Sequence, residues 1–302
     1  MSQKVLKNVA SSVRQHLLNK AKAEKRPFNE ILQYYAMERY LYRLSISPHA
    51  DRFILKGAMM LKAWGSPELR PTMDIDMLGR TDNDEAHLAS QIQEVLSVDV
   101  EPDGIVFDPK SITTEPIHED ADYIGIRLRF PGKLDTARIT LQIDVGIGDV
   151  VFPGPERTVL PAILDFPAPC LLCYSKESAI AEKFETMVKL SELNSRMKDF
   201  YDIWLLSRQF DFDGGLLAEA VRLTFRNRST DLTGLIPAFS KEFSELKQAQ
   251  WTAFLKRISQ DHVPREFADI ISAIKGFLLP IVEAENSGAT TPSRWVPPGP
   301  WR

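Results

Sequence analysis

Hydrophobic residues recur with helical spacing over the first fifty positions. Residues 31–47 carry an apolar stripe that includes Ile31, Tyr35 and Leu44, and residues 9–25 carry apolar or small residues at the same spacing. Because positions three and four apart share a face of an α-helix, both segments are predicted to be helices. The sequence SPHADR then ends the pattern.

Short strands are predicted after residue 52. Residues 53–55 form an apolar run, Gly57 predicts a turn, and Met60, Leu61 and Trp64 predict a helix after it. The later elements follow from the same two periodicities: a helix at 87–98, strands at 123–130 and 137–147, and helices from 176 to about 285.

The pattern therefore indicates an α+β protein, with a mixed sheet and flanking helices followed by a helical C-terminal region. We expect three parts: a core with a helical N-terminal segment at 1–168, a helical domain at 169–286, and a tail at 287–302. The tail is rich in proline and small polar residues, so it is expected to lack regular structure. Trp295 and Trp301 are candidates for docking on the body.

Composition narrows the class of protein. The 302 residues are 44% hydrophobic with a net charge of -4, and they contain no long apolar run, which argues against a membrane span. The segment MSQKVLKNVASSV lacks the apolar core of a secretory signal, so we expect a cytoplasmic protein. The acidic balance argues against a surface covered with nucleic-acid-binding residues but leaves room for a local basic groove. Cys170 and Cys173 form a single C-x-x-C motif, for which no metal or redox role is expected.

Two aspartates stand one residue apart in RPTMDIDMLG, at 70–79. Side chains alternate along a strand, so Asp74 and Asp76 should point to one face about 6.5 Å apart, while Ile75 points to the other. In ARITLQIDVGI the apolar residues occupy one face, which leaves Asp144 on the other with Thr140 and Gln142.

The three carboxylates would converge if their strands were neighbours. Such a group can hold one or two magnesium ions against a triphosphate. The alternative interpretation is that the D-x-D pattern ends an exposed edge strand and binds nothing.

The order of motifs resembles a known family. FILKGAMMLKAW followed by RPTMDIDM resembles the first motif of the nucleotidyltransferase superfamily, in which a glycine turn and a helix precede a strand with alternating aspartates. AMERYLYRLSISPHADRFILKGAMMLKAWG, RPTMDIDMLG, ESAIAEKFETMV and SRMKDFYDIWLL, in this order, resemble the AbiEii/AbiGii toxin family, the nucleotidyltransferase toxins of type IV toxin-antitoxin systems. The resemblance covers most of the chain.

This resemblance implies a nucleotidyltransferase-like sheet and an enzyme that uses Mg²⁺ to transfer a nucleoside monophosphate from a nucleoside triphosphate to RNA. The expected acceptor is the 3′ end of tRNA, whose extension would block aminoacylation and translation. The resemblance also implies an antitoxin encoded nearby, with which no stable complex is required.

Roles follow for residues in the matching segments. The resemblance implies metal ligands at Asp74 and Asp76, to which the strand alternation adds Asp144. It also implies catalytic residues at Asp74, Asp76, Lys183 and Asp202, and nucleotide-binding residues at Gly57, Ala58, Arg70, Thr72, Lys183 and Asp199. One position departs from the family, which usually carries Gly-Gly or Gly-Ser where this chain has Gly57 and Ala58. No serine hydroxyl is available there, so backbone amides at the start of the following helix are expected to bind phosphate.

The lysine and aspartates of the helical half allow a simpler interpretation. Lys183 flanks an apolar stripe, so from the residues alone it would be a solvated or snorkelling side chain, whereas the resemblance implies that it contacts the nucleotide phosphates. Asp199 and Asp202 share a helix face, and Asp199 is also explained as an acid near a helix amino terminus. We expect Asp202 to orient Lys183 or the nucleotide.

Basic residues form three groups, each of which is either a solvated surface or part of an RNA groove. They are Lys20, Lys22, Lys25 and Arg26; Arg127, Arg129, Lys133 and Arg138; and Arg222, Arg226 and Arg228. Three other functions remain open: a two-metal nuclease, a kinase-like phosphotransferase acting on protein, and a catalytically silent nucleotide-binding protein.

Overall fold

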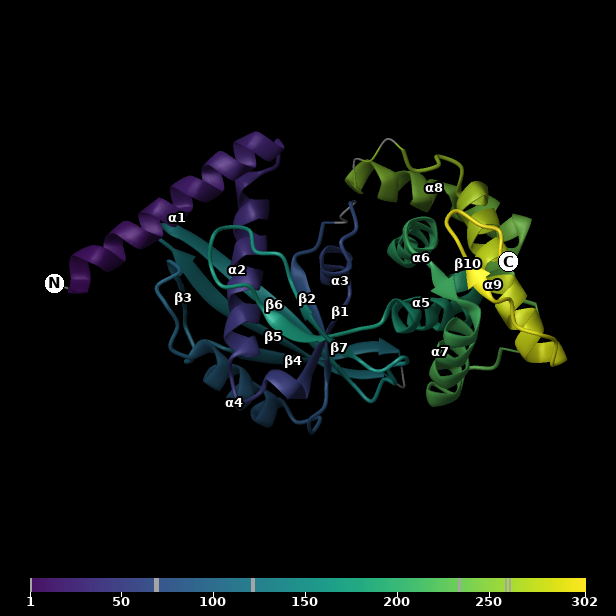
Figure 1. Ribbon diagram of the computed structural model, residues 1–302, viewed down its shortest axis with the longest axis horizontal. Helices are drawn as coiled ribbons and strands as arrows, with labels where there is room; N and C mark the ends of the chain where they lie inside the picture. Colours follow the sequence, from purple (N-terminus) through teal and green to yellow (C-terminus); the bar gives the residue numbers. More distant parts are fainter. Residues whose placement is uncertain (1, 68–70, 121–122, 233–234, 259, 261) are drawn as a thin grey trace. The chain divides into compact units, whose positions relative to one another are not determined.

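The chain packs into two compact units. The computed structural model describes residues 2–67, 71–120, 123–232, 235–258, 260 and 262–302 (Figure 1). The first unit comprises Met1–Gly148 and Glu156–Cys173, and the second comprises Asp149–Pro155 and Tyr174–Arg302. The domain boundaries expected from the sequence stay predictions, because compact packing alone does not establish independent folding.

The first unit is built on a mixed sheet. Within the described residues, its strands are β1 (Phe53–Lys56), β2 (Asp74–Gly79), β3 (Ile105–Phe107), β4 (Thr113–Asp120), β5 (Tyr123–Leu134), β6 (Ala137–Ile147), β7 (Glu156–Val159) and β8 (Cys170–Cys173). Their order is β3-β5-β6-β2-β1-β8-β7, and β4 pairs with the other end of β5. The α+β fold class predicted from the sequence is therefore confirmed.

Strand β2, which carries the two aspartates, lies inside the sheet. It pairs in parallel with β6 and antiparallel with β1. The alternative interpretation of D-x-D as the end of an exposed edge strand is therefore wrong. A strand with neighbours on both sides has fixed backbone partners, and its side chains are held at defined positions on each face.

One face of this sheet is apolar and covered by helices. Ile75 and Met77 of β2 lie opposite Ile143 and Val145 of β6, and all four are fully buried. Helix α2 (Phe28–Ser45) packs on β6, β8 and α4 (Glu85–Leu96), as Figure 1 shows for its course across the strands. Burial of these side chains fixes the face that each strand presents, because a slip of one residue would expose them.

A buried ion pair and a hydrogen bond from buried arginines connect α2 to the rest of its unit. Arg43 contacts Asp103 at 2.7 Å, and Arg39 contacts Glu38 at 2.8 Å while donating to the carbonyl of Pro167. All four charged side chains are buried. Removing one partner of such a pair leaves an uncompensated charge, so the position of α2 is strongly specified.

Two further helices complete the first unit. Helix α1 (Ser2–Glu24) packs on α2, and α3 (Met59–Ala63) packs on β1. The short 3₁₀ helix η1 (Ala50–Arg52) precedes β1. The predicted sequence of strand, turn at Gly57 and helix is confirmed, with Trp64 at the end of α3.

The second unit is mainly helical, as predicted. Its described elements are α5 (Lys176–Leu190), η2 (Ser191–Leu193), α6 (Met197–Gln209), β9 (Phe212–Asp213), α7 (Gly214–Asn227), η3 (Pro237–Phe239), α8 (Lys241–Ile258), α9 (Phe267–Ser287) and β10 (Arg294–Trp295). Ser175 caps α5 by accepting a hydrogen bond from the amide of Ser178. Phe200, Trp251 and Phe267 form part of a buried aromatic core.

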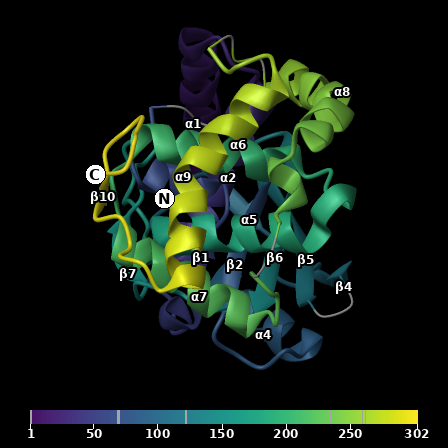
Figure 2. The same ribbon diagram turned by 90° about the vertical axis from the view of Figure 1, so that its right-hand side faces the viewer.

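The tail is more ordered than its composition predicts. Strand β10 pairs with β9, and Trp301 stacks on Phe277 of α9 at 5.7 Å between ring centroids. Trp295 donates its indole N–H to the carbonyl of Ser207. Figure 2 shows this segment running beside α9. The docking of both tryptophans is thus confirmed, and regular structure in the described tail after α9 is limited to the two residues of β10.

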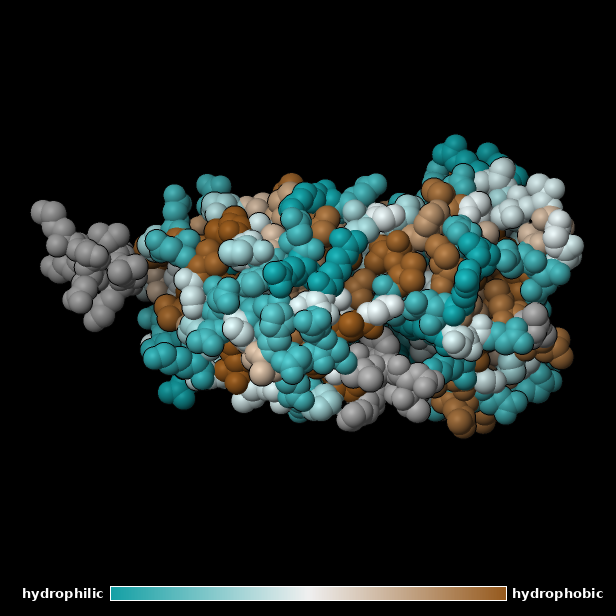
Figure 3. Space-filling model, turned by 90° about the horizontal axis from the view of Figure 1, so that it is seen from below, coloured by the Kyte–Doolittle hydropathy of each residue, from teal (hydrophilic) through white to brown (hydrophobic). Residues whose placement is uncertain are grey.

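Helices of the described residues are too short or too polar to cross a bilayer. The face drawn in Figure 3 is mostly hydrophilic, and its hydrophobic residues lie in separate groups. Exposed apolar residues are common on the surfaces of folded proteins.

Candidate active site

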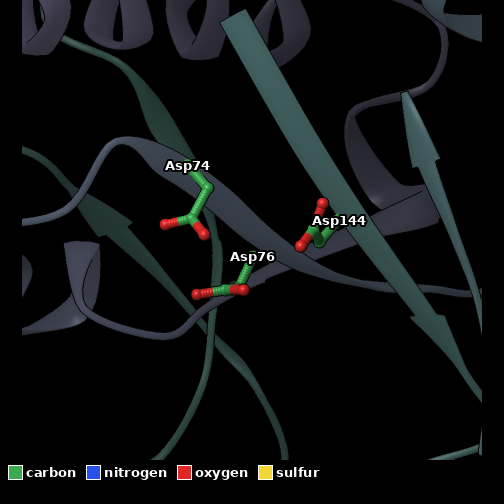
Figure 4. A group of neighbouring side chains, drawn as sticks. All are labelled: Asp74, Asp76 and Asp144. Atoms are coloured by element: carbon green, nitrogen blue, oxygen red, sulfur yellow. The ribbon is translucent and has the colours of Figure 1, made fainter. Parts of the chain in front are cut away.

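The three aspartates converge on the polar face of the sheet in the first unit. The parallel register of β2 and β6 sets Asp76 opposite Asp144, and Asp74 opposite Gln142. One carboxylate oxygen from each aspartate lies within 4.8 Å of the other two. Figure 4 shows these side chains on the two neighbouring strands. The predicted convergence is therefore confirmed, and metal binding by these residues stays a prediction.

Arg127 holds Asp144 from the next strand. Its Nε donates to Oδ1 at 2.8 Å and its Nη2 donates to Oδ2 at 2.7 Å. This two-pronged contact is the strongest geometry between a guanidinium and a carboxylate. The hydrogen bonds from Arg127 to Asp144 raise the pKa of Arg127 above its ordinary value. Asp144 is therefore fixed in place by the chain itself.

Asp74 is oriented by Thr72. The Thr72 hydroxyl donates to Oδ1 of Asp74, and the amide of Thr72 donates to the hydroxyl of Tyr34 on α2 at 3.1 Å. The side-chain amide of Gln33, also on α2, donates to the backbone carbonyls of Met73 at 3.1 Å and Thr140 at 3.3 Å. One buried side chain thus connects the segment before β2 with β6, the two segments that carry the carboxylates.

Gly57 makes room for Asp76. The glycine has a φ of +73°, and a Cβ added to it would lie 1.9 Å from Oδ2 of Asp76. No rotation of a methyl group relieves a contact that short. Glycine is therefore required at this position for two reasons. Its backbone conformation is left-handed, and the carboxylate of Asp76 leaves no room for a Cβ.

The phosphate cradle expected beside Gly57 would lie at the start of a short helix. Helix α3 has only five residues, and the amides of Met60 and Leu61 donate to the carbonyls of Gly57 and Ala58. A single turn gives a weak helix dipole. Thr72 contacts Asp74, and Ala58 directly follows Gly57, which lies against Asp76. Arg70, expected to bind nucleotide, lies outside the described residues.

Lys183 is paired with both aspartates of α6 within the second unit. Its Nζ lies 3.0 Å from Asp199 and 2.9 Å from Asp202. Arg196 contacts the other oxygen of Asp199 at 2.9 Å. The interpretation of Lys183 as a solvated surface lysine is therefore wrong, because its side chain is 19% exposed and held between two carboxylates.

Asp199 is charged despite its burial. Burial by itself would raise the pKa of Asp199, but the positive charges of Lys183 and Arg196 outweigh it, and the pKa lies below its ordinary value of 3.8. Asp199 therefore fixes Arg196 and Lys183 together, whereas Asp202 contacts Lys183 from the next turn. The lysine ammonium is held in one place by two anchors on a single helix.

The donor set of the three aspartates suits a hard cation. It consists of carboxylate oxygens, which Mg²⁺ prefers as protein ligands, and within the described residues it includes neither a thiol nor an imidazole. A divalent ion there would offset the repulsion among three negative charges. Carboxylates grouped in this way can hold the metal ions of phosphoryl-transfer chemistry.

Three residues that position the aspartates or their strands are not identified as site residues by the sequence pattern. The pattern places Arg127 only in a basic group, and Gln33 and Tyr34 only in a predicted helix. The alternation of residues 123–130 places Arg127 on the polar side of its strand, but the identity of its partner depends on the register Arg127 to Asp144, which only the folded sheet supplies. No local signal marks Gln33 or Tyr34.

Comparisons with known proteins give one family match and two similar structures. The family model described as "Nucleotidyl transferase AbiEii toxin, Type IV TA system" matches residues 39–273. No curated protein matches the chain. The crystal structure of JHP933 from Helicobacter pylori is similar at a TM-score of 0.50 and 15% identity, covering 86% of this chain and 94% of that one. The crystal structure of a proposed nucleotidyltransferase from H. pylori aligns with a TM-score of 0.49 and 14% identity, covering 87% of this chain and 98% of that one. At these identities the likeness concerns the fold alone.

Replacing Gly57 by alanine should disable the carboxylate group. We expect Gly57→Ala to weaken Mn²⁺ binding at least tenfold, because the new methyl group would displace Asp76. Isothermal titration with Mn²⁺ measures this directly, and thermal unfolding should show a loss of stability of about 1–2 kcal/mol from the left-handed backbone alone.

Gly65 offers a matched control. Its φ is +74° and a Cβ added there meets nothing within 4 Å. Gly65→Ala should show a similar loss of stability while binding Mn²⁺ as the unsubstituted protein does. Equal Mn²⁺ affinities for Gly57→Ala, Gly65→Ala and the unsubstituted protein would contradict the role assigned to Gly57.

Asp199 should stabilise the fold only where it is ionised. Its lowered pKa means that its contribution is fully present above pH about 4 and is lost as pH falls through the lower folded value. We expect Asp199→Asn to reduce the free energy of unfolding by about 1–3 kcal/mol at pH 7. In urea titrations followed by circular dichroism, the difference should narrow below pH about 4. A difference independent of pH would show that Asp199 does not act through its charge.

Proposed function

Because the chain belongs to the AbiEii nucleotidyl transferase toxin family of type IV toxin-antitoxin systems, we propose that it uses Mg²⁺ to transfer a nucleoside monophosphate from a nucleoside triphosphate to RNA, with the 3′ end of tRNA as acceptor. The observation that carries this proposal is the convergence of Asp74, Asp76 and Asp144 on the polar face of β2 and β6. Family membership implies a nucleotidyltransferase, and the oxygen ligands favour Mg²⁺ among the common divalent ions.

Asp74, Asp76 and Asp144 would hold the metal. When bound, Mg²⁺ lowers the pKa of the acceptor hydroxyl and neutralises charge on the triphosphate. Thr72 keeps Asp74 oriented, Arg127 keeps Asp144 oriented, and Gly57 keeps the space of Asp76 open. These three contacts would reduce the reorganisation needed when substrate binds.

The proposed reaction is an in-line displacement at the α-phosphorus. A hydroxyl oxygen of the acceptor forms a bond to this phosphorus, and the bond between the phosphorus and the bridging oxygen of the β-phosphate breaks. Pyrophosphate leaves with that electron pair, and the hydroxyl proton passes to solvent. The acceptor gains one nucleotide.

Lys183 would bind the phosphates of the nucleotide. Its ammonium is a compact charge held by Asp199 and Asp202, so it can contact phosphate oxygens without first being ordered. We assign Asp202 the role of orienting Lys183, with Asp199 as a second anchor that also binds Arg196. Gly57, Ala58, Arg70 and Thr72 complete the residues proposed to line the nucleotide site.

The proposed biological effect is arrest of translation. Nucleotides added to the 3′ end of tRNA would prevent aminoacylation in the cytoplasm, where the substrates occur. An antitoxin encoded beside the toxin would counter this effect without forming a stable complex with it.

A transfer assay tests the proposal. Purified protein is incubated with Mg²⁺, total tRNA and each α-labelled nucleoside triphosphate in turn, and RNA is resolved on a denaturing gel. We expect label to enter RNA, and Asp76→Asn and Asp144→Asn to reduce the rate at least a hundredfold. Asp82→Asn serves as control, since Asp82 is exposed and lies in the segment after β2.

The alternative functions predict different products. Shortened RNA would indicate a two-metal nuclease. Label from a γ-labelled triphosphate on a protein, with nucleoside diphosphate as product, would indicate a kinase-like activity. Intact and unlabelled RNA with all four nucleotides would overturn the RNA acceptor.

A further inference from the structure

Most basic side chains in the three groups are already engaged. Arg26 pairs with Glu24 and Glu30, and Lys20 pairs with Glu24. In the second unit, Arg228 is held by Asp149, Glu182 and Glu185, and Arg222 by Glu219. Such arginines and lysines serve the fold and are poorly placed to bind another molecule.

The hairpin of β5 and β6 is different. Lys133 and Arg138 lie directly opposite each other near its turn, and both side chains are exposed. Within the described residues neither has a carboxylate at ion-pair distance, although Asp135 lies in the turn between them. Like charges directly opposite on neighbouring strands are destabilising. The chain therefore keeps a locally unfavourable pair of positive charges.

The same register places this pair on the face of the aspartates. From the turn inward, the opposed pairs at every second position are Lys133 with Arg138, Pro131 with Thr140, Arg129 with Gln142, and Arg127 with Asp144. Because side chains two residues apart share a face, the line from Lys133 ends at Asp144, and Asp144 lies beside Asp76. Six residues of strand separate Lys133 from Arg127, which is about 20 Å.

The basic side chains along this line differ in whether they pair with a carboxylate. At the inner end Arg127 and Arg129 are paired with Asp144 and Glu115, whereas Lys133 and Arg138 at the outer end are not. Pro131 and Thr140 between them are exposed and short. A polyanion could therefore lie along the strands with its outer phosphates on Lys133 and Arg138.

We propose that Lys133 and Arg138 bind the phosphodiester backbone of the RNA acceptor and direct its end toward Asp74, Asp76 and Asp144. This inference rests on the proposed function, since it assumes an RNA acceptor. A single triphosphate bound at the aspartates is too short to contact both ends of a line of about 20 Å, whereas roughly six stacked nucleotides span it. The contacts are to phosphate, so they act without regard to base sequence.

Neutralising the pair tests the proposal. Binding of fluorescein-labelled tRNA is measured by anisotropy over a range of salt concentrations, with EDTA and without nucleotide, so that transfer does not contribute. We expect Lys133→Gln with Arg138→Gln to weaken binding at least tenfold at low salt. The slope of log affinity against log salt should fall in magnitude by about 1.4, at 0.7 for each lost phosphate contact.

The control removes the same charge elsewhere in the same unit. Lys22 and Lys25 are exposed and belong to another of the basic groups. Lys22→Gln with Lys25→Gln should leave tRNA affinity and salt slope unchanged. Thermal unfolding should show that Lys133→Gln with Arg138→Gln is at least as stable as the unsubstituted protein, because the repulsion is removed.

The outcomes separate this inference from the proposed function. If the unsubstituted protein labels tRNA and the hairpin variant binds tRNA with unchanged affinity and slope, the hairpin contact is wrong and the RNA acceptor stands. If the control variant loses as much affinity as the hairpin variant, binding follows net charge and the hairpin contact is also wrong. If the unsubstituted protein neither binds nor labels tRNA, both fail.

Discussion

The parallel pairing of β2 with β6 is the interaction on which the candidate site depends. It sets Asp76 opposite Asp144, and a shift of one residue would turn one of these carboxylates toward the apolar face. The buried pairs formed by Ile75 with Ile143 and by Met77 with Val145 hold that register from the other side of the sheet. Packing of the core and placement of the polar groups are thus two consequences of one strand alignment.

Three negative charges in a small space repel one another, and each of the three aspartates is positioned by a different contact. Arg127 neutralises Asp144, Thr72 donates a hydrogen bond to Asp74, and Gly57 leaves space beside Asp76. None of these contacts replaces a cation shared by all three. The carboxylates are therefore oriented by the fold in advance, so that a bound ion would meet ligands already in place.

Much of this arrangement follows from the sequence. Alternation in residues 137–147 separates the buried face from Asp144, and the D-x-D spacing puts Asp74 and Asp76 on one face. Convergence could be predicted once the two strands were assumed to be neighbours. Local periodicity reports which face a residue occupies, and this information was sufficient for the carboxylates.

The remainder depends on contacts between distant segments. Strands β4 and β7 are largely polar and lie at the margins of the sheet, so they lack the alternation of a half-buried strand. Arg127 carries no sign in the sequence that its partner is Asp144 and not a ligand. Gln33 lies within a predicted helix, and its link to the carbonyls of Met73 and Thr140 spans 40 and 107 residues. The tail docks through Trp295 and Trp301, whose partners Ser207 and Phe277 lie far away in the sequence.

Asp74, Asp76 and Asp144 are proposed to bind divalent metal ions together. Anomalous diffraction from crystals soaked in Mn²⁺, recorded near the manganese absorption edge, would locate such ions. We expect an anomalous peak within coordination distance of carboxylate oxygens from all three residues, and its loss in crystals of Asp76→Asn. Peaks elsewhere, with none at these aspartates in the unsubstituted protein, would contradict this proposal.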